Sequence, residues 1–152
     1  MDYICELKKV AAQPVVTIRT RTASWELQKF FGQAYGEIFE YLEQIGVQPT
    51  GSPFAAYHNG DMEDLDIEAG VPIAKIVSGK GRITSHEIEA GYQLTTIHVG
   101  PYSEIEPAYE TLMEFAKEKK LVPTGIAYEF YLNNPMETEE EDLQTEIAFP
   151  LR

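Results

Sequence analysis

The sequence predicts an α+β fold in which two pseudo-symmetric strand–helix–strand–strand repeats form one antiparallel sheet with two main helices and a central groove. Three observations predict this fold. The segment PTGSPFAAYHN at 49–59 returns, little changed, as PTGIAYEFYLN at 123–133. In each half, a stretch rich in β-branched residues precedes an amphipathic helical pattern. After the shared Pro-Thr-Gly, each half continues into two more strand-like stretches, an order typical of an α+β domain.

The repeat extends beyond these turns. Residues 34–59 align without a gap onto residues 108–133. IEAGVPI at 67–73 also resembles TEIAFPL at 145–151 after a small shift. Two long copies do not fit a solenoid, which stacks several short units, so we interpret them as an internal duplication. We expect a single domain over residues 1–152, with repeats of approximately 1–79 and 80–152.

The elements of the first half follow from local patterns. PVVTIRT at 14–20 predicts a strand. The next segment predicts a helix with Ser24 as its N-cap and Gly46 as its C-terminal stop. Its expected core stripe, spaced at three- and four-residue steps, is Leu27, Phe31, Ala34, Ile38, Leu42 and Ile45. FAAYHN at 54–59 and GVPIAKIV at 70–77 complete this half as strands.

The second half repeats this order. YQLTTIHV at 92–99 predicts a strand, and a helix follows with Tyr109, Leu112, Met113 and Ala116 on its apolar side. Ser103 and Glu106 have capping-box spacing, but Pro107 lacks an amide hydrogen, so a helix start at Pro107 remains an alternative. The remaining strands are expected at 127–133, at 144–151 and, in the segment that links the halves, within 81–91.

Composition and charge exclude several classes of protein. The formal net charge is −13, with 12 scattered Lys and Arg residues, so we expect no direct binding to nucleic acid. Such acidity suits a cationic ligand or a basic protein partner. No apolar run is long enough to span a membrane, and the first residues do not form a signal peptide. Cys5 is the single cysteine, which fits a reducing compartment, so we expect a cytoplasmic protein.

Glu129 marks a difference between the two repeats, because Ala55 occupies the matching position. Side chains alternate along a strand, so Glu129 and Tyr131 share one face, as Ala55 and Tyr57 do in the first half. A carboxylate inside an apolar strand is costly to bury without a partner. The two halves thus keep an aromatic residue at this face and differ by one carboxylate.

Three interpretations of Glu129 remain open from the residues alone. Glu129 pairs with an arginine such as Arg19 or Arg21, or faces solvent. Alternatively, it holds a cationic or polar ligand, with tyrosine faces adding cation–π attraction. In the third interpretation it acts as an acid or base, with a tyrosine hydroxyl orienting the reacting group.

Several motifs in order carry a resemblance to a known family. These are GSPFAAYHN, DLDIEAGVPI, AGYQLTTIHVGPYSEIEPAYETL, YEFYLNNP and LQTEIAFPL. Together they resemble the GyrI-like small-molecule-binding domain, which is also the effector-binding domain of AraC- and MerR-type multidrug regulators in bacteria. The resemblance covers essentially the whole chain. It implies a duplicated SOUL/SHS2-like fold with a ligand groove between its two modules.

The resemblance also implies a set of ligand-binding residues. By motif position, Glu129 is the acidic residue that meets cationic, lipophilic ligands, with Tyr57 and Tyr102 among the surrounding aromatics. Face parity adds Tyr131 to these. Trp25, the single tryptophan, is a candidate for the groove mouth, and Phe30, off the expected core stripe, is a further pocket candidate.

Other candidate residues are read as structural. His58, His86 and His98 show no metal-ligand spacing, and no cofactor motif is present, so we expect neither a metal nor a cofactor. Tyr35 and Tyr109 are repeat mates within helices and are expected to pack in the core. The acids of DLDIEAG at 64–70 lack the EF-hand pattern and are expected at the entry to a strand.

Three functions follow as hypotheses. The first is a stand-alone cytoplasmic protein that binds small lipophilic molecules, cationic ones among them. The second is a hydrolase of strained, cyclopropane-bearing toxins, with Glu129 as general base and Tyr57 or Tyr102 donating to the developing anion. The third is an acidic inhibitor that binds a basic protein surface such as DNA gyrase. The regulators of this family carry an additional helix-turn-helix domain, for which we expect no room in this chain.

Overall fold

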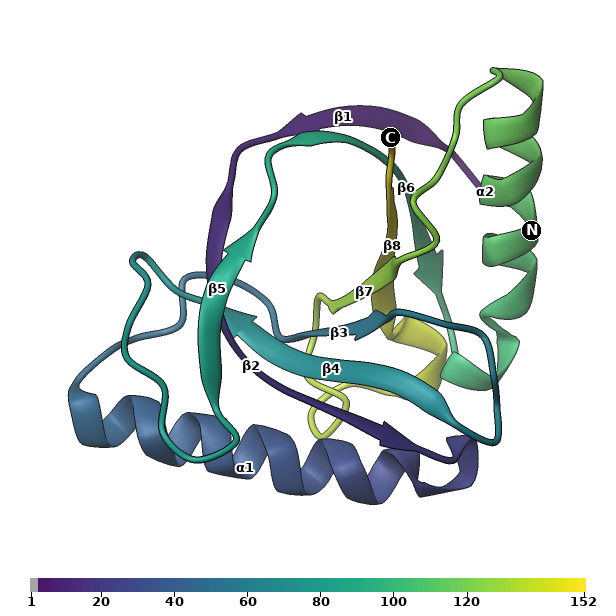
Figure 1. Cartoon of the computed structure of the whole chain (residues 1–152). Coiled ribbons are helices and arrows are strands. Elements are labelled where there is room, and N and C mark those ends of the chain that lie inside the picture. The colour runs from purple at the N-terminus through teal and green to yellow at the C-terminus, as the bar shows by residue number, and fades with distance from the viewer. Residues whose placement is uncertain (1–2) are drawn as a thin grey trace. The chain divides into compact units, whose positions relative to one another are not determined.

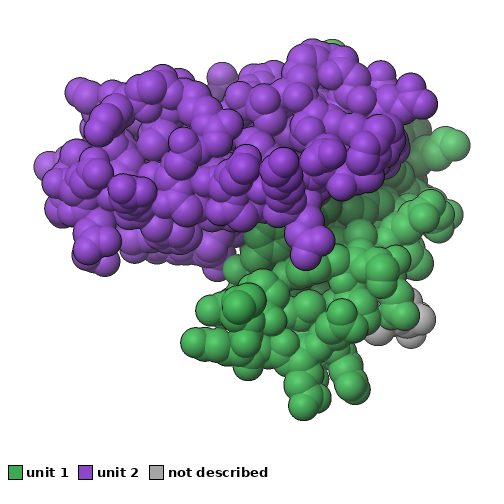
Figure 2. All heavy atoms as spheres, turned by 90° about the horizontal axis from the view of Figure 1, so that it is seen from below, with its two compact units in different colours: residues 1–10, 91–152 green, residues 11–90 purple. Residues whose placement is uncertain are grey.

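The computed structural model describes residues 3–152 and confirms the predicted α+β class, with antiparallel strands and two main helices (Figure 1). The chain divides into two compact units, which Figure 2 shows in different colours. Unit 1 contains the N-terminal segment up to Val10 together with residues 91–152, and unit 2 contains residues 11–90. The single domain over residues 1–152, with a repeat boundary at about residue 79, stays a prediction.

Unit 2 contains four strands and one long helix. In chain order its elements are β2 (Gln13–Thr22), η1 (Ser24–Glu26), α1 (Leu27–Ile45), β3 (Phe54–Tyr57), β4 (Leu65–Pro72) and β5 (Thr84–Ile88). The strands pair antiparallel in the order β3-β4-β2-β5, and α1 packs against β4 and β2. The segment that links the halves therefore does supply a strand, β5, at the edge of this sheet.

Unit 1 also contains four strands and one main helix, but one of its strands comes from the start of the chain. Its elements are β1 (Glu6–Val10), β6 (Gly91–Val99), η2 (Tyr102–Glu104), α2 (Glu106–Glu118), β7 (Ala127–Tyr131), η3 (Glu140–Asp142) and β8 (Gln144–Pro150). The strands pair antiparallel in the order β1-β6-β8-β7, and α2 packs against β6. The edge position that β5 fills in unit 2 is filled here by β1.

The strand registers support the duplication read from the sequence. Tyr57 lies opposite Ile67 in the β3–β4 pair, and its repeat mate Tyr131 lies opposite Thr145 in the β7–β8 pair. These partners are themselves mates in the alignment of IEAGVPI with TEIAFPL. A shift of one residue in either pair would exchange the two faces of the strand, so the agreement fixes the same face for equivalent residues.

The core stripe of α1 lies at a slightly different angle from the predicted one. Its buried residues are Phe30, Ala34, Ile38, Tyr41 and Leu42. Ile45, expected in the core, is 41% exposed, and Phe30, expected outside the stripe, is buried. Spacings of three and four residues connect the observed set as well as the expected one, so periodicity alone did not distinguish them.

The buried face of α2 is narrow. Ala108, Leu112 and Ala116 pack into a cluster with Leu94, Ile147 and Phe149. Met113, expected on this apolar side, is exposed. The half-buried Tyr109 packs against this cluster.

Both predicted N-terminal caps are wrong, because each helix is preceded by a short 3-10 turn. Ser24 begins η1, and α1 starts at Leu27 without a side-chain cap. Likewise Ser103 lies within η2, and α2 starts at Glu106 without the capping-box bond. Pro107 is tolerated in the first turn of α2, where its missing amide hydrogen costs no intrahelical bond.

The C-terminal stop at Gly46 is confirmed. Gly46 has a φ of 70°, and its amide donates to Glu43 and Leu42 carbonyls at the end of α1. The strand predicted at 70–77 is wrong in its bounds, since β4 begins at Leu65 and ends at Pro72.

Gly70 should be one of the least replaceable residues of unit 2. A methyl group at Gly70 would lie 2.6 Å from Thr17 Cγ2 and 2.7 Å from the Val16 carbonyl oxygen, so backbone would have to move. We expect Gly70→Ala to lower the free energy of unfolding by about 2 kcal/mol in urea titrations. Gly32→Ala is the matched control, because the exposed Gly32 of α1 has nothing within 4 Å of the new methyl group. It should stabilise the protein by about 0.5–1 kcal/mol, and equal effects of both variants would contradict the packing argument.

Candidate functional site

Glu129 is a buried carboxylate held by two tyrosine hydroxyls. It lies in the middle of β7 and is 8% exposed. Tyr131 donates to Glu129 Oε1 at 3.1 Å, and Tyr109 donates to Glu129 Oε2 in a short hydrogen bond. Each carboxylate oxygen therefore accepts one phenolic hydrogen, and both donors are neutral groups.

Local structure explains how the three side chains meet. Glu129 and Tyr131 are two residues apart on β7, so they share a face, as the sequence predicts. Glu129 lies opposite Ile147, a member of the cluster that α2 covers. The carboxylate therefore points to the α2 side of the unit 1 sheet, where Tyr109 of α2 reaches it.

The environment of Glu129 disfavours its ionised form. Burial raises the pKa of Glu129 above its usual value, and the hydrogen bonds from Tyr109 and Tyr131, with the nearby His98, offset only part of this effect. The pKa of Tyr102 is also raised, first by burial and then by the charge of Glu129. A buried carboxyl group with a raised pKa beside phenols can bind a cation or exchange a proton.

Tyr102 and Tyr131 form an aromatic pair next to the carboxylate. Their ring centroids are 5.7 Å apart with an interplanar angle of 70°, an edge-to-face arrangement. Tyr102 begins η2, directly after the Gly100–Pro101 turn. The structure therefore brings together Glu129, Tyr131 and Tyr102 within unit 1, and it adds Tyr109.

The other predicted site residues belong to unit 2. Tyr57 ends β3 and is half-buried. Trp25 lies in η1 and is 72% exposed, so it is not packed at the helix end. Phe30 is buried in α1, with its ring centroid 5.7 Å from that of Phe31. Their assignment to a ligand site stays a prediction.

The structural alternative for Glu129 is wrong. Arg19 makes a bidentate ion pair with Asp66, at 2.8 Å and 2.7 Å, and Arg21 pairs with Asp64. Glu129 does not face solvent either, since it is buried. The two arginines instead neutralise acids of β4 and the residue before it, which explains part of the acidic segment DLDIEAG.

The sequence predicts core packing for Tyr109, and the structure adds a role for its hydroxyl that this prediction does not contain. Its ring does lie beside Phe149, at 5.8 Å between centroids, but its hydroxyl binds Glu129. Its repeat mate Tyr35 donates to the Phe54 carbonyl oxygen at 2.5 Å instead. Ala55 and Glu129 are repeat mates, so the half that lacks the carboxylate is also the half in which the tyrosine donates to a backbone carbonyl.

A second buried glutamate, Glu68 on β4, was not expected. It is 5% exposed, and its two oxygens face the Nε2 atoms of two histidines. His58 lies 2.9 Å from Oε1, and His86 of β5 lies 2.7 Å from Oε2. The hydroxyl of Thr17 on β2 also bonds to this carboxylate. Burial would raise the pKa of Glu68, but these hydrogen bonds outweigh it and lower the pKa to about 2.

The Glu68 cluster has a counterpart in unit 1. His86 lies opposite Val15 in the β2–β5 pair, and Lys8 lies opposite Gln93 in the β1–β6 pair. These are equivalent edge-strand positions. Lys8 binds Glu146, the repeat mate of Glu68, at 2.9 Å. In both units, a basic residue of the edge strand thus binds a glutamate at the equivalent position of β4 or β8.

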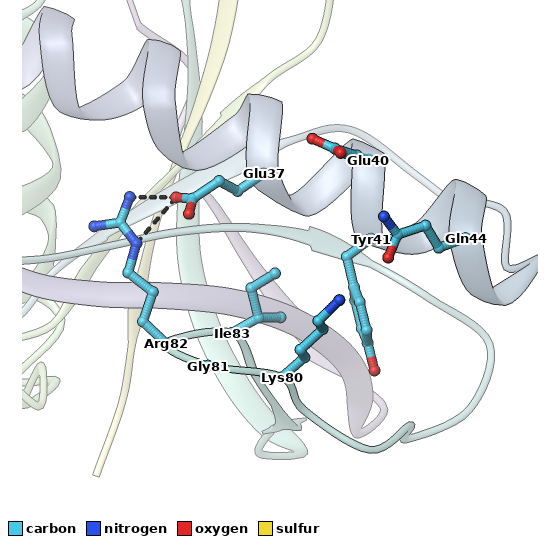
Figure 3. Close-up of a pocket in the computed structure, with 8 residues that line it drawn as sticks. All are labelled: Glu37, Glu40, Tyr41, Gln44, Lys80, Gly81, Arg82 and Ile83. Carbon is cyan, nitrogen blue, oxygen red and sulfur yellow. Dashed lines mark hydrogen bonds and ion pairs between the residues drawn. The ribbon is translucent and has the colours of Figure 1, made fainter.

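A separate hollow of about 280 Å³ lies between α1 and the turn before β5 (Figure 3). Its lining residues are Glu37, Glu40, Tyr41 and Gln44 of α1 with residues 80–83. Figure 3 shows Arg82 directed at Glu37, to which its Nε donates at 3.0 Å. None of the residues predicted for the ligand site lines this hollow. Its lining contains two acidic residues, Glu37 and Glu40, and two basic residues, Lys80 and Arg82.

Two kinds of feature are not found among the described residues. Within residues 3–152, no group of three or more His, Cys, Asp or Glu side chains is placed to hold a metal ion. None of the helices formed by these residues is long and apolar enough to cross a membrane.

Comparison with known proteins decides the family. The model of the GyrI-like small-molecule-binding domain matches residues 5–152. The chain belongs to this family. Membership of the GyrI-like family confirms the resemblance read from the motifs and establishes a small-molecule-binding domain. Among curated proteins, none matches the chain significantly.

Solved structures of low sequence identity share the GyrI-like fold. The C-terminal domain of EcmrR has a TM-score of 0.85 at 24% identity, over 100% of this chain and 99% of that one. EcmrR in an EcmrR–DNA complex has a TM-score of 0.86 at 22% identity. The match covers 99% of this chain but 57% of the EcmrR chain. A hydrolase from Listeria innocua has a TM-score of 0.71 at 14% identity, over 97% and 91% of the two chains.

The structure of SAV2435 bound to tetraphenylphosphonium is also similar, with a TM-score of 0.63 at 11% identity, over 100% of this chain and 94% of that one. At these identities the likeness establishes the fold alone. Activities of the relatives are therefore not transferred by similarity. The cytoplasmic location and the gyrase partner of this GyrI-like domain stay predictions.

Proposed function

We propose that this GyrI-like domain binds small lipophilic cations, with Glu129 as the anionic group of its site. One observation carries the proposal: a carboxylate that is 8% exposed receives its hydrogen bonds from two neutral tyrosine hydroxyls. An ionised carboxylate in such surroundings is costly, and a cationic ligand would lower that cost. A positively charged ligand would therefore be stabilised by the carboxylate of Glu129.

The neighbouring aromatics favour a large apolar cation. Tyr102 and Tyr131 present ring surface beside Glu129, and rings attract cations through their π faces. We infer that Tyr57, Trp25 and Phe30 contribute further aromatic surface to ligand binding. The tetraphenylphosphonium complex of SAV2435 shows that a protein of this fold can hold such a cation.

The proposal is tested by titration calorimetry with two probes of the same shape and opposite charge. Tetraphenylphosphonium should bind the wild type, whereas the tetraphenylborate anion should bind at least tenfold more weakly. Glu129→Gln should reduce this preference for the cation, since the amide carries no charge. Equal binding of both probes, or a preference that survives in Glu129→Gln, would refute the assignment of Glu129.

Hydrolysis is a second candidate function, favoured by the raised pKa of Glu129 beside phenolic hydroxyls. Glu129 would take a proton from an attacking water, and a tyrosine such as Tyr102 would donate to the developing anion. Product formation from a strained cyclopropane-bearing compound tests this. A hydrolase should keep binding in Glu129→Gln but lose turnover, whereas a binding protein should show no turnover in either form.

A further inference from the structure

His98 is a fully buried histidine on the same face as Glu129. It lies near the end of β6, is 1% exposed, and lies opposite Thr145, which in turn lies opposite Tyr131. Directly opposed residues of neighbouring strands share a face. His98 and Tyr131 are therefore on the face where Tyr131 donates to Glu129.

Both ring nitrogens of His98 are engaged. Nε2 lies 3.0 Å from the carbonyl oxygen of Pro101, and Nδ1 lies 2.8 Å from the hydroxyl of Tyr3. A carbonyl oxygen only accepts, so Nε2 must carry the hydrogen. In the neutral imidazole, Nδ1 then accepts the hydrogen of the Tyr3 hydroxyl. These contacts define the tautomer and hold the ring between Tyr3, which precedes β1, and the turn after β6.

The turn held by His98 is the one that presents Tyr102. Gly100 has a φ of 131°, a conformation that favours glycine, and its amide donates to the Leu143 carbonyl at 2.8 Å. The Pro101 carbonyl also accepts from the Glu104 amide at 3.0 Å, which closes the 3-10 turn that Tyr102 begins. One carbonyl oxygen thus joins His98 to the start of η2, immediately before Tyr102.

We propose that His98 is a positioning residue of the ligand site, which acts through the Pro101 carbonyl to hold Tyr102 against Tyr131 beside Glu129. This role rests on the proposed function of the Glu129 site. His98 itself need not touch the ligand. It sets the edge-to-face geometry of Tyr102 and Tyr131, and so the aromatic surface that a cation meets.

A double-mutant cycle tests the proposal, with tetraphenylphosphonium as the probe and the full chain as the protein. His98→Phe keeps a ring of similar size but has no donor for Pro101. We expect it to weaken binding about tenfold, and we expect a similar loss for Tyr102→Ala. The double variant should bind no more weakly than Tyr102→Ala alone, because both changes remove the same contact. Wild-type affinity in His98→Phe, or effects that multiply, would overturn the proposal.

Two variants separate positioning from general stability. His98→Gln places an amide N–H where Nε2 stood and should recover affinity to within about threefold of the wild type. Tyr3→Phe removes the other hydrogen bond of the ring but leaves the Pro101 contact, so it should change affinity less than twofold. Thermal midpoints measured alongside should fall in both His98→Phe and Tyr3→Phe, and equal loss of affinity in these two variants would indicate a structural role alone.

A measurement on the wild type keeps the proposal testable if His98→Phe fails to fold. In ¹⁵N spectra of the histidine rings at neutral pH, His98 should show the Nε2–H tautomer, with slow exchange of that hydrogen with solvent. An Nδ1–H tautomer would overturn the proposal. If instead the wild type shows this tautomer but binds no probe, the proposed function fails on its own.

Discussion

Lowering the pH should weaken binding of a lipophilic cation to the wild type by up to about tenfold per unit, once the pH falls below the raised pKa of Glu129. The protonated carboxyl group no longer carries the charge that attracts the ligand. Because burial raises this pKa, the loss should begin at a higher pH than for an exposed glutamate. Tetraphenylphosphonium titrations between pH 4.5 and 8.5 measure it, and Glu129→Gln should give a flat profile.

The same raised pKa has an effect of opposite sign on stability. Because the folded state disfavours the ionised carboxylate, Glu129 costs folding free energy at pH values above its folded pKa, and this cost disappears below its unfolded pKa. Glu129→Gln should therefore raise the thermal midpoint of the ligand-free protein at pH 8 and have little effect at pH 4. Glu146→Gln is the matched control, since its carboxylate binds Lys8 at 2.9 Å and its loss should not stabilise the protein. A lower midpoint for Glu129→Gln at pH 8 would contradict this account.

Glu68→Gln should be among the most destabilising single substitutions in unit 2. The pKa of Glu68, lowered from 4.5 to about 2, corresponds to a contribution on the order of 3 kcal/mol from its ionised form. Since the folded pKa is the lower one, this contribution is complete above pH 4.5 and is lost as the pH falls toward 2. Urea titrations at pH 7 and at pH 2.5 should show a large effect of Glu68→Gln in the first case and a small one in the second.

Two controls belong to the Glu68 measurement. Glu43→Gln, on the exposed side of α1, should change the free energy of unfolding by less than about 0.5 kcal/mol at either pH. His86→Lys introduces the residue type that Lys8 supplies at the equivalent position of unit 1. It should keep most of the stability at pH 7, because an ammonium group can bind the carboxylate, as Lys8 binds Glu146. If Glu43→Gln and Glu68→Gln behaved alike, the cluster would have no special role.

Much of the site geometry could be predicted because it depends on one strand. The alternation of side chains along β7 places Glu129 beside Tyr131, and the hydrogen bond between them follows that parity. Likewise, the shared turns and matching registers of the two repeats follow from an ungapped alignment. Gly46 ends its helix because a left-handed residue is needed there, a purely local requirement.

Contacts between elements could not be predicted in the same way. Tyr109 reaches Glu129 from α2, and helical periodicity does not predict which residue of a strand a helix side chain contacts. The Glu68 cluster joins β4, β5 and the end of β3, so no single segment contains its pattern. The caps at Ser24 and Ser103 failed for another reason, since the preceding 3-10 turns occupy both serines.

The assignment of β1 to unit 1 has a consequence for the order in which the protein folds. Unit 2 is continuous in the chain, so its four strands can pair as soon as residue 90 has left the ribosome. Unit 1 is discontinuous, and its β1 must wait for β6, with Glu6 pairing to Thr95 across all of unit 2. Closing so long a loop is entropically slow unless the intervening chain is already compact. If unit 2 folds first, the loop between β1 and β6 becomes effectively shorter. We therefore expect unit 2 to fold before β1 pairs with β6.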